Sequence, residues 1–537
     1  MNRQKHLGVM LDCSRNGVIR LSALRRFIPL IAKMGYNTLL LYTEDTYTIE
    51  GEPYFGYLRG RYSADEIKEI DKICMQNGVE LIPCIQTLAH LGAILRWPAY
   101  SSVHDVNDIL LCGEEKTYAL IDKMLKCCAE CFSSKRVHIG MDEAHMVGLG
   151  KYLDRHGFCD RFSVLKAHLD RVAALTEKHG LQPMMWSDMF FRLCSKGQYY
   201  IKDPDAVTKQ AIDAVPKNME LVYWDYYSTD KPHYDTMFKA HQKFNRPVWF
   251  AGGAYSWSGF TPHNGFSIRA NTAALQSCRE SGVQNIFITM WGDNGSECSC
   301  FALLPALYHA AATVNGITDK AQIKAGFEEQ IGIPYDAFML LDLPGTEYTN
   351  SGSPANPDKY LFYNDYFLGV FDTTVKPEQA ALYRALEPRL LEYANHPEFG
   401  YLFAMESALC GVLKLKADFG VRLRAAYEKR DLPRLFKLAE EMESMEQKIK
   451  DFAKAFASAW EKEKKPHGFE THDLRIGGLL QRTQRCKERL LAFANGTLPS
   501  IPELEETLLD PECNPNAGAR NVYKNDWTGS FASRFGW

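Results

Sequence analysis

Two adjacent carboxylates are the most informative chemical feature of the sequence. Asp142 and Glu143 follow Arg136–Gly140, a short segment that we expect to be a strand. Successive side chains of a regular strand point to opposite faces, so both acids can face one cavity only if the chain turns at Gly140. A pair in which one group keeps a proton and the other stays charged is typical of acid–base chemistry on sugars. The alternative is that these acids only cap the following helix.

Aromatic and acidic residues also stand at the ends of other expected strands. Trp186 ends one strand, Tyr223-Trp224-Asp225 ends the next, and Trp291-Gly292-Asp293 ends the last, while His90 follows the third. Aromatic rings can cover the apolar face of a sugar, and carboxylates accept hydrogen bonds from its hydroxyls. Each tryptophan alone would be read as core packing, but together these residues stand at the strand ends, where barrels of parallel strands carry their functional residues.

A repeated strand–helix unit positions these residues. We expect strands at Leu7–Leu11, Thr38–Tyr42, Val79–Ile85, Arg136–Gly140, Pro183–Trp186, Glu220–Trp224, Pro247–Ala251 and Asn285–Met290. Several of them lack polar–apolar alternation, as expected of parallel strands that are buried on both faces. Eight such repeats predict an α/β fold, a (β/α)8 TIM barrel, whose active-site face is the end at which the strands finish.

Helical patterns dominate the C-terminal part of the chain. We divide the sequence into a barrel over 1–315, connecting loops and helices over 316–375, and an α-helical domain over 376–537. Apolar residues between Leu435 and Trp460 are spaced three and four apart, which predicts one long amphipathic helix. We favour its packing in an intramolecular bundle over a coiled-coil seam, and a homodimer built partly on these helices remains an alternative.

Composition and charge exclude several classes of function. The 537 residues include 62 Lys+Arg and 66 Asp+Glu, which gives a formal net charge of −4. This balance argues against a dedicated nucleic-acid binder, which needs clustered basic residues. No window approaches the ~18 apolar residues of a membrane span, and the N-terminus makes a poor secretory signal, so we expect a cytoplasmic protein. The 15 cysteines lack metal-ligand spacing, and we expect reduced thiols and no metal.

The stretch His138-Ile139-Gly140-Met141-Asp142-Glu143 resembles the His-x-Gly-x-Asp-Glu motif of the glycoside hydrolase family 20 β-N-acetylhexosaminidases. Further family motifs follow in the same order: Trp186, then Tyr223-Trp224-Asp225 for Tyr-x-Asp, then Trp291-Gly292-Asp293 for Trp-x-Glu. His90 resembles the family's pocket histidine more loosely. The sequence is most similar to the shorter bacterial members, which carry a helical C-terminal domain.

The resemblance covers residues 5–310 and implies an exo-acting, retaining enzyme that removes terminal β-linked GlcNAc or GalNAc. In this family the acetamido oxygen of the substrate acts as the nucleophile and forms an oxazolinium intermediate. Glu143, buried beside a charged Asp142, would protonate the leaving oxygen. Asp142 would orient the acetamido N–H, and Tyr223 would donate to the acetamido oxygen. The resemblance implies neither a metal nor an organic cofactor.

The other motif residues would bind the sugar. The residues implied are His90, His138, Trp186, Trp224, Asp225, Trp291 and Asp293. Two departures leave the preference among GlcNAc, GalNAc and 6-modified sugars open. Asp293 replaces a longer Glu, and the family's strand-one Arg has no direct counterpart, although His6 and Arg15 are near. The alternatives are a non-catalytic barrel that binds acetamido sugars and an ordinary two-carboxylate β-glycosidase.

Overall fold

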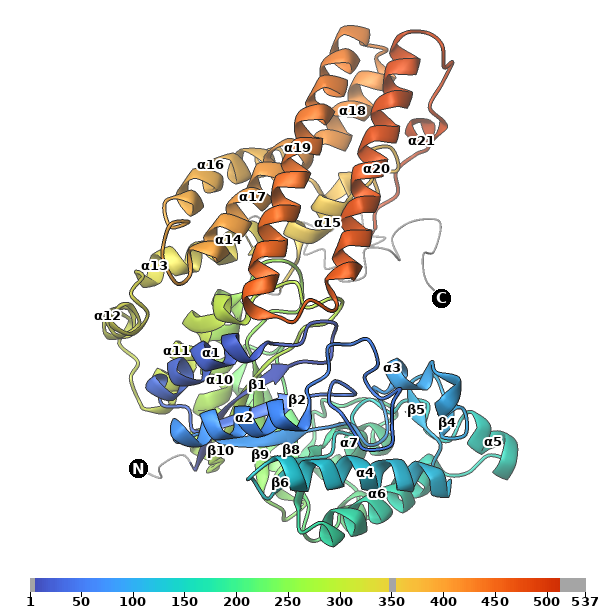
Figure 1. The fold of residues 1–537 in the computed structure, drawn as a ribbon, viewed down its shortest axis with the longest axis vertical. Coiled ribbons are helices and arrows are strands. Elements are labelled where there is room, and N and C mark those ends of the chain that lie inside the picture. The colour runs from blue at the N-terminus through green and yellow to red at the C-terminus, as the bar shows by residue number, and fades with distance from the viewer. Residues whose placement is uncertain (1–4, 347–353, 512–537) are drawn as a thin grey trace. The chain divides into compact units, whose positions relative to one another are not determined.

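Eight parallel strands close into a barrel in the computed structural model, which describes residues 5–346 and 354–511 (Figure 1). The strands are β1 (His6–Asp12), β2 (Thr38–Tyr42), β3 (Glu80–Cys84), β6 (Arg136–His138), β7 (Gln182–Trp186), β8 (Glu220–Trp224), β9 (Val248–Gly253) and β10 (Asn285–Met290). They are hydrogen-bonded in the order β1-β10-β9-β8-β7-β6-β3-β2. The predicted (β/α)8 barrel is therefore confirmed.

Helices alternate with these strands along the chain. They are α1 (Leu21–Met34), α2 (Ala64–Gln76), α3 (Gly92–Leu95), α4 (Glu115–Cys131), α5 (Lys151–His156), α6 (Arg161–Lys178), α7 (Asp188–Cys194), α8 (Lys209–Ala214), α9 (Lys231–Gln242), α10 (Asn264–Ser281) and α11 (Leu304–Val314), with a hairpin of β4 (His104–Val106) and β5 (Ile109–Leu110). In α1 the buried residues Leu24, Phe27, Ile28 and Ile31 form one face, because their spacing matches the helical repeat. Gly35 ends this helix in a left-handed conformation at φ 100°.

The described residues form two units by their mutual contacts. The first comprises 5–254, 267–291 and 307–319, and the second comprises 255–266, 292–306, 320–346 and 354–511. All barrel strands belong to the first unit. The predicted division had also assigned 255–266 and 292–306 to the barrel, whereas the structure groups them with the second unit. Parts of the predicted C-terminal regions, 347–353 and 512–537, lie outside the described residues.

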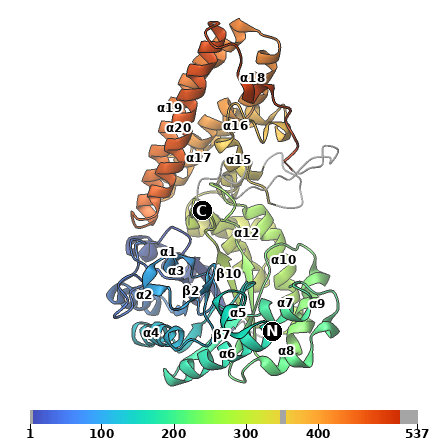
Figure 2. The same ribbon diagram turned by 90° about the vertical axis from the view of Figure 1, so that its right-hand side faces the viewer.

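Helices make up most of the second unit. They are α12 (Lys320–Ile331), α13 (Tyr335–Phe338), α14 (Leu343–Thr346), α15 (Pro357–Tyr363), α16 (Gln379–Leu391), α17 (Gly400–Lys416), α18 (Phe419–Glu428), α19 (Leu432–Glu463), α20 (Phe469–Ala494) and α21 (Pro502–Glu505). The apolar stripe from Leu435 to Trp460 is buried along α19, which packs against α17 and α20 (Figure 2). The stripe is thus covered within its own unit and offers no exposed coiled-coil seam, so the homodimer stays a prediction.

The cysteines behave as small apolar residues in both units. Every cysteine among residues 5–346 and 354–511 is a free thiol, and most of these thiols are buried. Over the same part of the chain, no helix has both the length and the apolar character required to cross a bilayer.

Candidate active site

Strand register determines which side chains enter the barrel. Asp12, Tyr42, Cys84 and His138 are Cα partners across β1, β2, β3 and β6. Side chains in register on neighbouring parallel strands share one face of the sheet. These four residues stand at or near the C-terminal ends of their strands, which is the end where such barrels carry their active sites.

Trp186 and Trp291 both lie inside the barrel end. The ring of Trp186 lies 5.9 Å from that of Phe287, whose strand β10 is not a neighbour of β7, so this contact crosses the barrel interior. The ring centroids of the two tryptophans are 6.1 Å apart, and Trp291 meets Tyr42 edge-on at 4.8 Å. Trp186 is 1% exposed and Trp291 is 8% exposed. The two predicted tryptophans therefore form one aromatic wall.

The chain turns sharply after β6. Gly140, Met141 and Glu143 have φ values of 72°, 70° and 50°, in the left-handed region. A Cβ atom on Gly140 would lie 2.0 Å from Gln86 Oε1, which also accepts a hydrogen bond from the Met141 N–H at 3.1 Å. Because the backbone doubles back here, the adjacent side chains of Asp142 and Glu143 can both approach the same partner, as the sequence predicted for a turn at Gly140.

That partner is His90, whose Nε2 lies 3.1 Å from Asp142 Oδ2 and 3.7 Å from Glu143 Oε2. Burial alone would lower the pKa of His90, but the negative charge of Asp142 outweighs it and raises the pKa to about 9. The backbone N–H of His90 donates to Asp108 Oδ2 at 3.0 Å. His90 is therefore cationic at neutral pH and fixed between the two acids.

Asp142 is the buried, charged member of the pair. Gln86 Nε2 donates to Asp142 Oδ1 at 2.7 Å and to the Tyr42 hydroxyl at 2.9 Å. Burial would raise the pKa of Asp142, but the charge of His90 and the hydrogen bonds from His90 and Gln86 hold it at about 2. Gln86 was not among the predicted residues, although it lies four positions before His90 in the same loop.

Glu143 is the accessible member of the pair, in contrast to its expected burial. Its side chain is 41% exposed, and its Oε1 lies 3.7 Å from Arg192 Nη2. The Glu143 N–H donates to Asp188 Oδ2 at 3.1 Å, and the same oxygen accepts from Arg192 Nε at 2.9 Å. Burial and the charge of Asp142 raise the pKa of Asp188 to about 7. Asp188 thus holds the left-handed backbone of Glu143, a role that the sequence analysis missed.

Tyr223 and Asp225 lie on the outer face of β8, which corrects their predicted positions. Strand register points Val222 inward, so the next residue points outward toward the helices. The ring of Tyr223 packs against Phe238 of α9 at 5.3 Å, and its hydroxyl donates to Asp225 Oδ2 at 2.8 Å. The same oxygen lies 2.6 Å from His233 Nε2. The predicted contacts of both residues with a sugar do not fit this placement.

Tyr226 is a second tyrosine of this segment, and its hydroxyl lies beside Trp291. It is 5% exposed and hydrogen-bonds with Trp291, and the charge of Asp142 acts on it. An indole has only an N–H to give, so the Tyr226 oxygen accepts that bond, and the same hydroxyl also hydrogen-bonds with Thr289. The predicted Trp224 stacks on this ring, with centroids 5.4 Å apart. Tyr226 lies one residue beyond the recognised motif.

Two further predicted residues are His138, inside the barrel, and Asp293, in the second unit. His138 is fully buried against Trp186, with ring centroids 4.4 Å apart, and its Nδ1 accepts a hydrogen bond from the Gly140 N–H at 3.1 Å. Burial lowers the pKa of His138 to about 3, so the imidazole is neutral. Asp293 is half-buried in the segment 292–306, which belongs to the second unit.

Arg15 occupies the barrel mouth near β1, whereas His6 lies at the opposite end of that strand. The guanidinium of Arg15 lies 4.7 Å from the Trp291 ring centroid, and two of its nitrogens lie 3.5 Å from Asp12 Oδ2 and Glu44 Oε1. Of the two basic residues that the sequence left open, only Arg15 is therefore placed to contact a ligand at the mouth.

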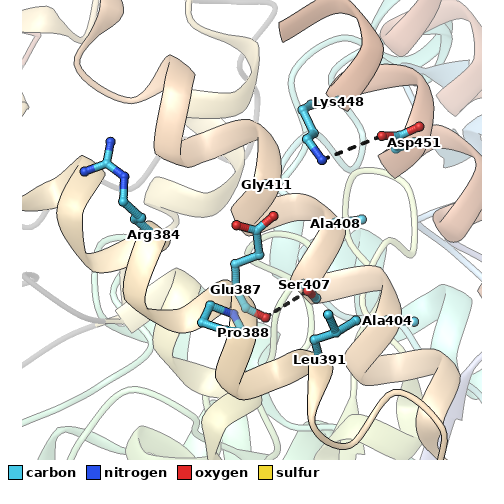
Figure 3. A pocket seen from close by; sticks show the side chains of 10 residues that line it. All are labelled: Arg384, Glu387, Pro388, Leu391, Ala404, Ser407, Ala408, Gly411, Lys448 and Asp451. Carbon is cyan, nitrogen blue, oxygen red and sulfur yellow. Dashed lines mark hydrogen bonds and ion pairs between the residues drawn. The ribbon is translucent and has the colours of Figure 1, made fainter. Parts of the chain in front are cut away.

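A groove of about 550 Å³ in the second unit offers a different chemistry (Figure 3). It is lined by Arg384, Glu387, Pro388, Leu391, Ala404, Ser407, Ala408, Gly411, Lys448 and Asp451. Lys448 and Asp451 pair at 3.9 Å, and none of the ten residues is aromatic or a histidine. Within the part of the chain that the structure describes, no three His, Cys, Asp or Glu side chains are grouped as metal ligands. The acid pair in the barrel therefore remains the better candidate.

Replacing Gly140 with alanine is expected to lower any activity of the acid pair at least about tenfold and to destabilise the fold by about 1–3 kcal/mol. The added Cβ would displace Gln86 and the turn that presents Asp142. Gly78→Ala is the matched control, because Gly78 follows the end of α2 with a similar φ of 69° and no atom lies within 4 Å of the position that its Cβ would take. Thermal unfolding and turnover of both variants check the result, and equal effects in the two would contradict the proposed clash.

The barrel, the acid pair and the aromatic wall define the class of this protein: a (β/α)8 barrel with a glycosidase-like acid pair at its mouth. Residues 5–250 match the model of "Glycosyl hydrolase family 20, catalytic domain". Residues 336–522 match that of "Glycoside Hydrolase 20C C-terminal domain". The chain belongs to glycoside hydrolase family 20, which confirms the resemblance found in its motifs.

The chain is also similar to individual proteins. It is 27% identical to Hexosaminidase D of Homo sapiens over 358 residues, 63% of this chain and 70% of that protein. It is 27% identical to Hexosaminidase D of Bos taurus over 213 residues, 38% of this chain and 58% of that protein. Among solved structures, a GH20 exo β-N-acetylglucosaminidase from Vibrio harveyi has 15% identity and a TM-score of 0.47, with coverage of 63% of this chain and 59% of that chain.

Proposed function

We propose that this protein is an exo-acting, retaining β-N-acetylhexosaminidase that removes terminal β-linked GlcNAc or GalNAc. The observation that carries the proposal is the acid pair itself. Asp142 is held charged by His90 and Gln86, and accessible Glu143 approaches the same His90. Gln86 also donates to Tyr42, whose ring contacts Trp291 of the aromatic wall. A sugar with a 2-acetamido group needs this division between one charged acid and one acid that transfers a proton.

In the first step Glu143 gives its proton to the glycosidic oxygen as the C1–O bond breaks. The acetamido oxygen of the substrate forms a bond to C1 at the same time, and the positive charge of the oxazolinium ring spreads onto its nitrogen. In the second step Glu143 takes a proton from water, and the water oxygen replaces the acetamido oxygen at C1. Two displacements at C1 retain the β configuration.

Asp142 and Tyr226 act on the acetamido group in this proposal. The carboxylate of Asp142 accepts the acetamido N–H and stabilises the positive charge that develops on the ring. The Tyr226 hydroxyl takes the role predicted for Tyr223, because it lies beside Trp291 and feels the charge of Asp142. The sugar ring lies against Trp291, and Arg15 with Asp12 and Glu44 offers partners to its distal hydroxyls.

Turnover of aryl β-N-acetylglucosaminide and β-N-acetylgalactosaminide tests this proposal directly. We expect the released sugar to keep its β configuration by NMR and a cyclised, oxazoline-shaped acetamido mimic to inhibit competitively. Plain aryl β-glucosides are the matched control and are expected to react at least about 10²-fold more slowly, since they lack the internal nucleophile.

Two other outcomes would replace the proposal. Equal cleavage of plain glucosides without inhibition by the cyclised mimic would indicate an ordinary two-carboxylate β-glycosidase. Binding of acetamido sugars without turnover of any β-linked substrate would indicate a sugar-binding barrel. The cytoplasmic location and the homodimer remain predictions that these measurements leave unchanged.

A further inference from the structure

A cavity of the first unit opens beside the Glu143 side of the acid pair, since Arg192 lines it and lies 3.7 Å from Glu143. It has a volume of about 390 Å³. Its lining residues are His145, Arg161, Met189, Arg192, Leu193, Lys196 and Gly197. They come from the loop after β6, the start of α6, and α7 with the turn that follows it. We call this cavity the basic pocket.

Positive charge dominates the basic pocket. Arg161, Arg192 and Lys196 line it, and only Arg192 has carboxylate partners, Asp188 at 2.9 Å and Glu143 at 3.7 Å. Among the described residues, neither Arg161 nor Lys196 forms an ion pair, and the buried Nε of Arg161 has no hydrogen-bond partner. An unpaired guanidinium nitrogen shielded from water is costly unless a ligand supplies an acceptor.

The positive charges of the basic pocket also act on His145. Burial and the charge of Arg192 lower the pKa of His145, and Arg161 acts in the same direction. The His145 carbonyl accepts a hydrogen bond from Arg161 Nη2, which fixes the guanidinium at the pocket wall. Met189 and Leu193 add an apolar side to the cavity, so the pocket combines fixed cations with a surface for a ring.

The basic pocket borders the carboxyl group of Glu143, which protonates the leaving oxygen in the proposed reaction. Arg192 contacts both, since it lines the pocket and lies 3.7 Å from Glu143 Oε1. The His145 N–H also donates to the Glu143 carbonyl. The leaving part of the substrate takes the proton of Glu143, so it lies on the side of that carboxyl group. The leaving part therefore lies next to the basic pocket.

We propose that the basic pocket binds an anionic group, a carboxylate or a sulfate or phosphate ester, on the leaving part of the substrate. This inference rests on the proposed function and specifies its substrate class: a terminal N-acetylhexosamine β-linked to an acidic residue. Arg161 supplies planar donors to the anion, and Lys196 closes the pocket as a mobile charge. Fixed cations at this position also raise the encounter rate of anionic substrates at low salt.

The test compares two aryl β-N-acetylglucosaminides that differ only in a carboxylate on the aryl ring. For the wild type, kcat/KM of the carboxylated compound is expected to exceed that of the neutral one by about tenfold at low ionic strength, and the ratio falls as salt is added. Lys196→Ala is expected to reduce this ratio about fivefold and Lys196→Glu to abolish it, while Lys196→Arg retains it. Lys217→Ala is the matched control, because Lys217 is an exposed lysine before β8, at the other end of the strand.

Binding of uncleavable sulfur-linked analogues separates this inference from the proposed function. Calorimetry with neutral, carboxylated and sulfated aglycones measures the pocket even if no substrate is turned over. Tighter binding of either anionic analogue that Lys196→Glu removes would support the pocket, and the stronger of the two identifies the anion. Equal Kd values for all three analogues would overturn the proposed anion site. A ratio of neutral to anionic Kd values that Lys196→Glu leaves unchanged would also overturn it.

Discussion

Glu143→Gln is expected to lower kcat about 10³-fold for substrates with a sugar leaving group, whose oxygen must be protonated as it departs. A nitrophenyl leaving group is stable as an anion and needs little protonation. For nitrophenyl substrates, the reduction in the rate of the first step is therefore expected to be much smaller. The dependence on leaving group is the signature of a missing proton donor. Steady-state kinetics with a series of aglycones of graded acidity measures it.

Sodium azide provides an independent check on the same variant. Azide is a nucleophile that needs no general base, so it is expected to restore turnover of the nitrophenyl substrate and to give the β-glycosyl azide. The amide keeps the size of the side chain beside His90 and Arg192, so the melting temperature is expected to stay close to that of the wild type. Glu177→Gln on the exposed face of α6 is the matched control. An equal loss for every aglycone, without azide rescue, would exclude Glu143 as the acid–base group.

The barrel could be predicted from the sequence because its strands are buried on both faces. Thr38–Tyr42, Glu220–Trp224 and Asn285–Met290 have the predicted bounds, and each is an apolar run closed by turn residues. The fourth strand was predicted two residues too long, over Arg136–Gly140, because the chain leaves the barrel at His138 to make its turn. Local hydrophobicity thus fixes where strands lie better than where they end.

The site could be predicted only where a motif marks a residue. Asp142, Glu143 and His90 were predicted as site residues and the structure brings them together, whereas Gln86 in a loop and Asp188 at the start of α7 carry no motif that marks them. Their role depends on distances across the barrel, which no local spacing encodes.

The sequence analysis assigned to Tyr223 a role that the structure favours for Tyr226, and this error has a different cause. Three tyrosines stand within five residues, and which of them faces the barrel depends on register and on where β8 ends. A shift of one residue moves a side chain to the other face. The motif found the correct segment, but only the register with β7 could assign Tyr223 to the outside and leave Tyr226 at the mouth.

Asp142→Asn is expected to lower kcat about 10²–10³-fold for acetamido substrates. The amide keeps the shape of the side chain but removes the negative charge that stabilises the oxazolinium ring. It also removes the partner that keeps His90 charged, and burial then shifts the pKa of His90 downward from about 9. The cyclised mimic, which carries the developing charge, is expected to lose affinity in parallel with kcat. Asp170→Asn on the exposed face of α6 is the matched control.

The stability that the His90–Asp142 pair gives to the wild type is expected to depend on pH in a defined window. His90 has a raised pKa, so its contribution is complete below the unfolded value of about 6.5 and is lost as pH rises through about 9. Asp142 has a lowered pKa, so its contribution is present above about 3.9 and is lost as pH falls through about 2. The pair therefore stabilises the fold most between about pH 4 and 6.5.

Thermal unfolding of the wild type and Asp142→Asn from pH 4 to 10 measures this window. The difference in melting temperature is expected to be largest near pH 5–6 and to shrink toward pH 10, because the neutral imidazole no longer favours a carboxylate over an amide. The catalytic loss, in contrast, is expected to persist at pH 8, where His90 is still protonated in the wild type. A difference in melting temperature that stays constant with pH, together with an unchanged kcat, would show that the charge of Asp142 serves neither the histidine nor the substrate.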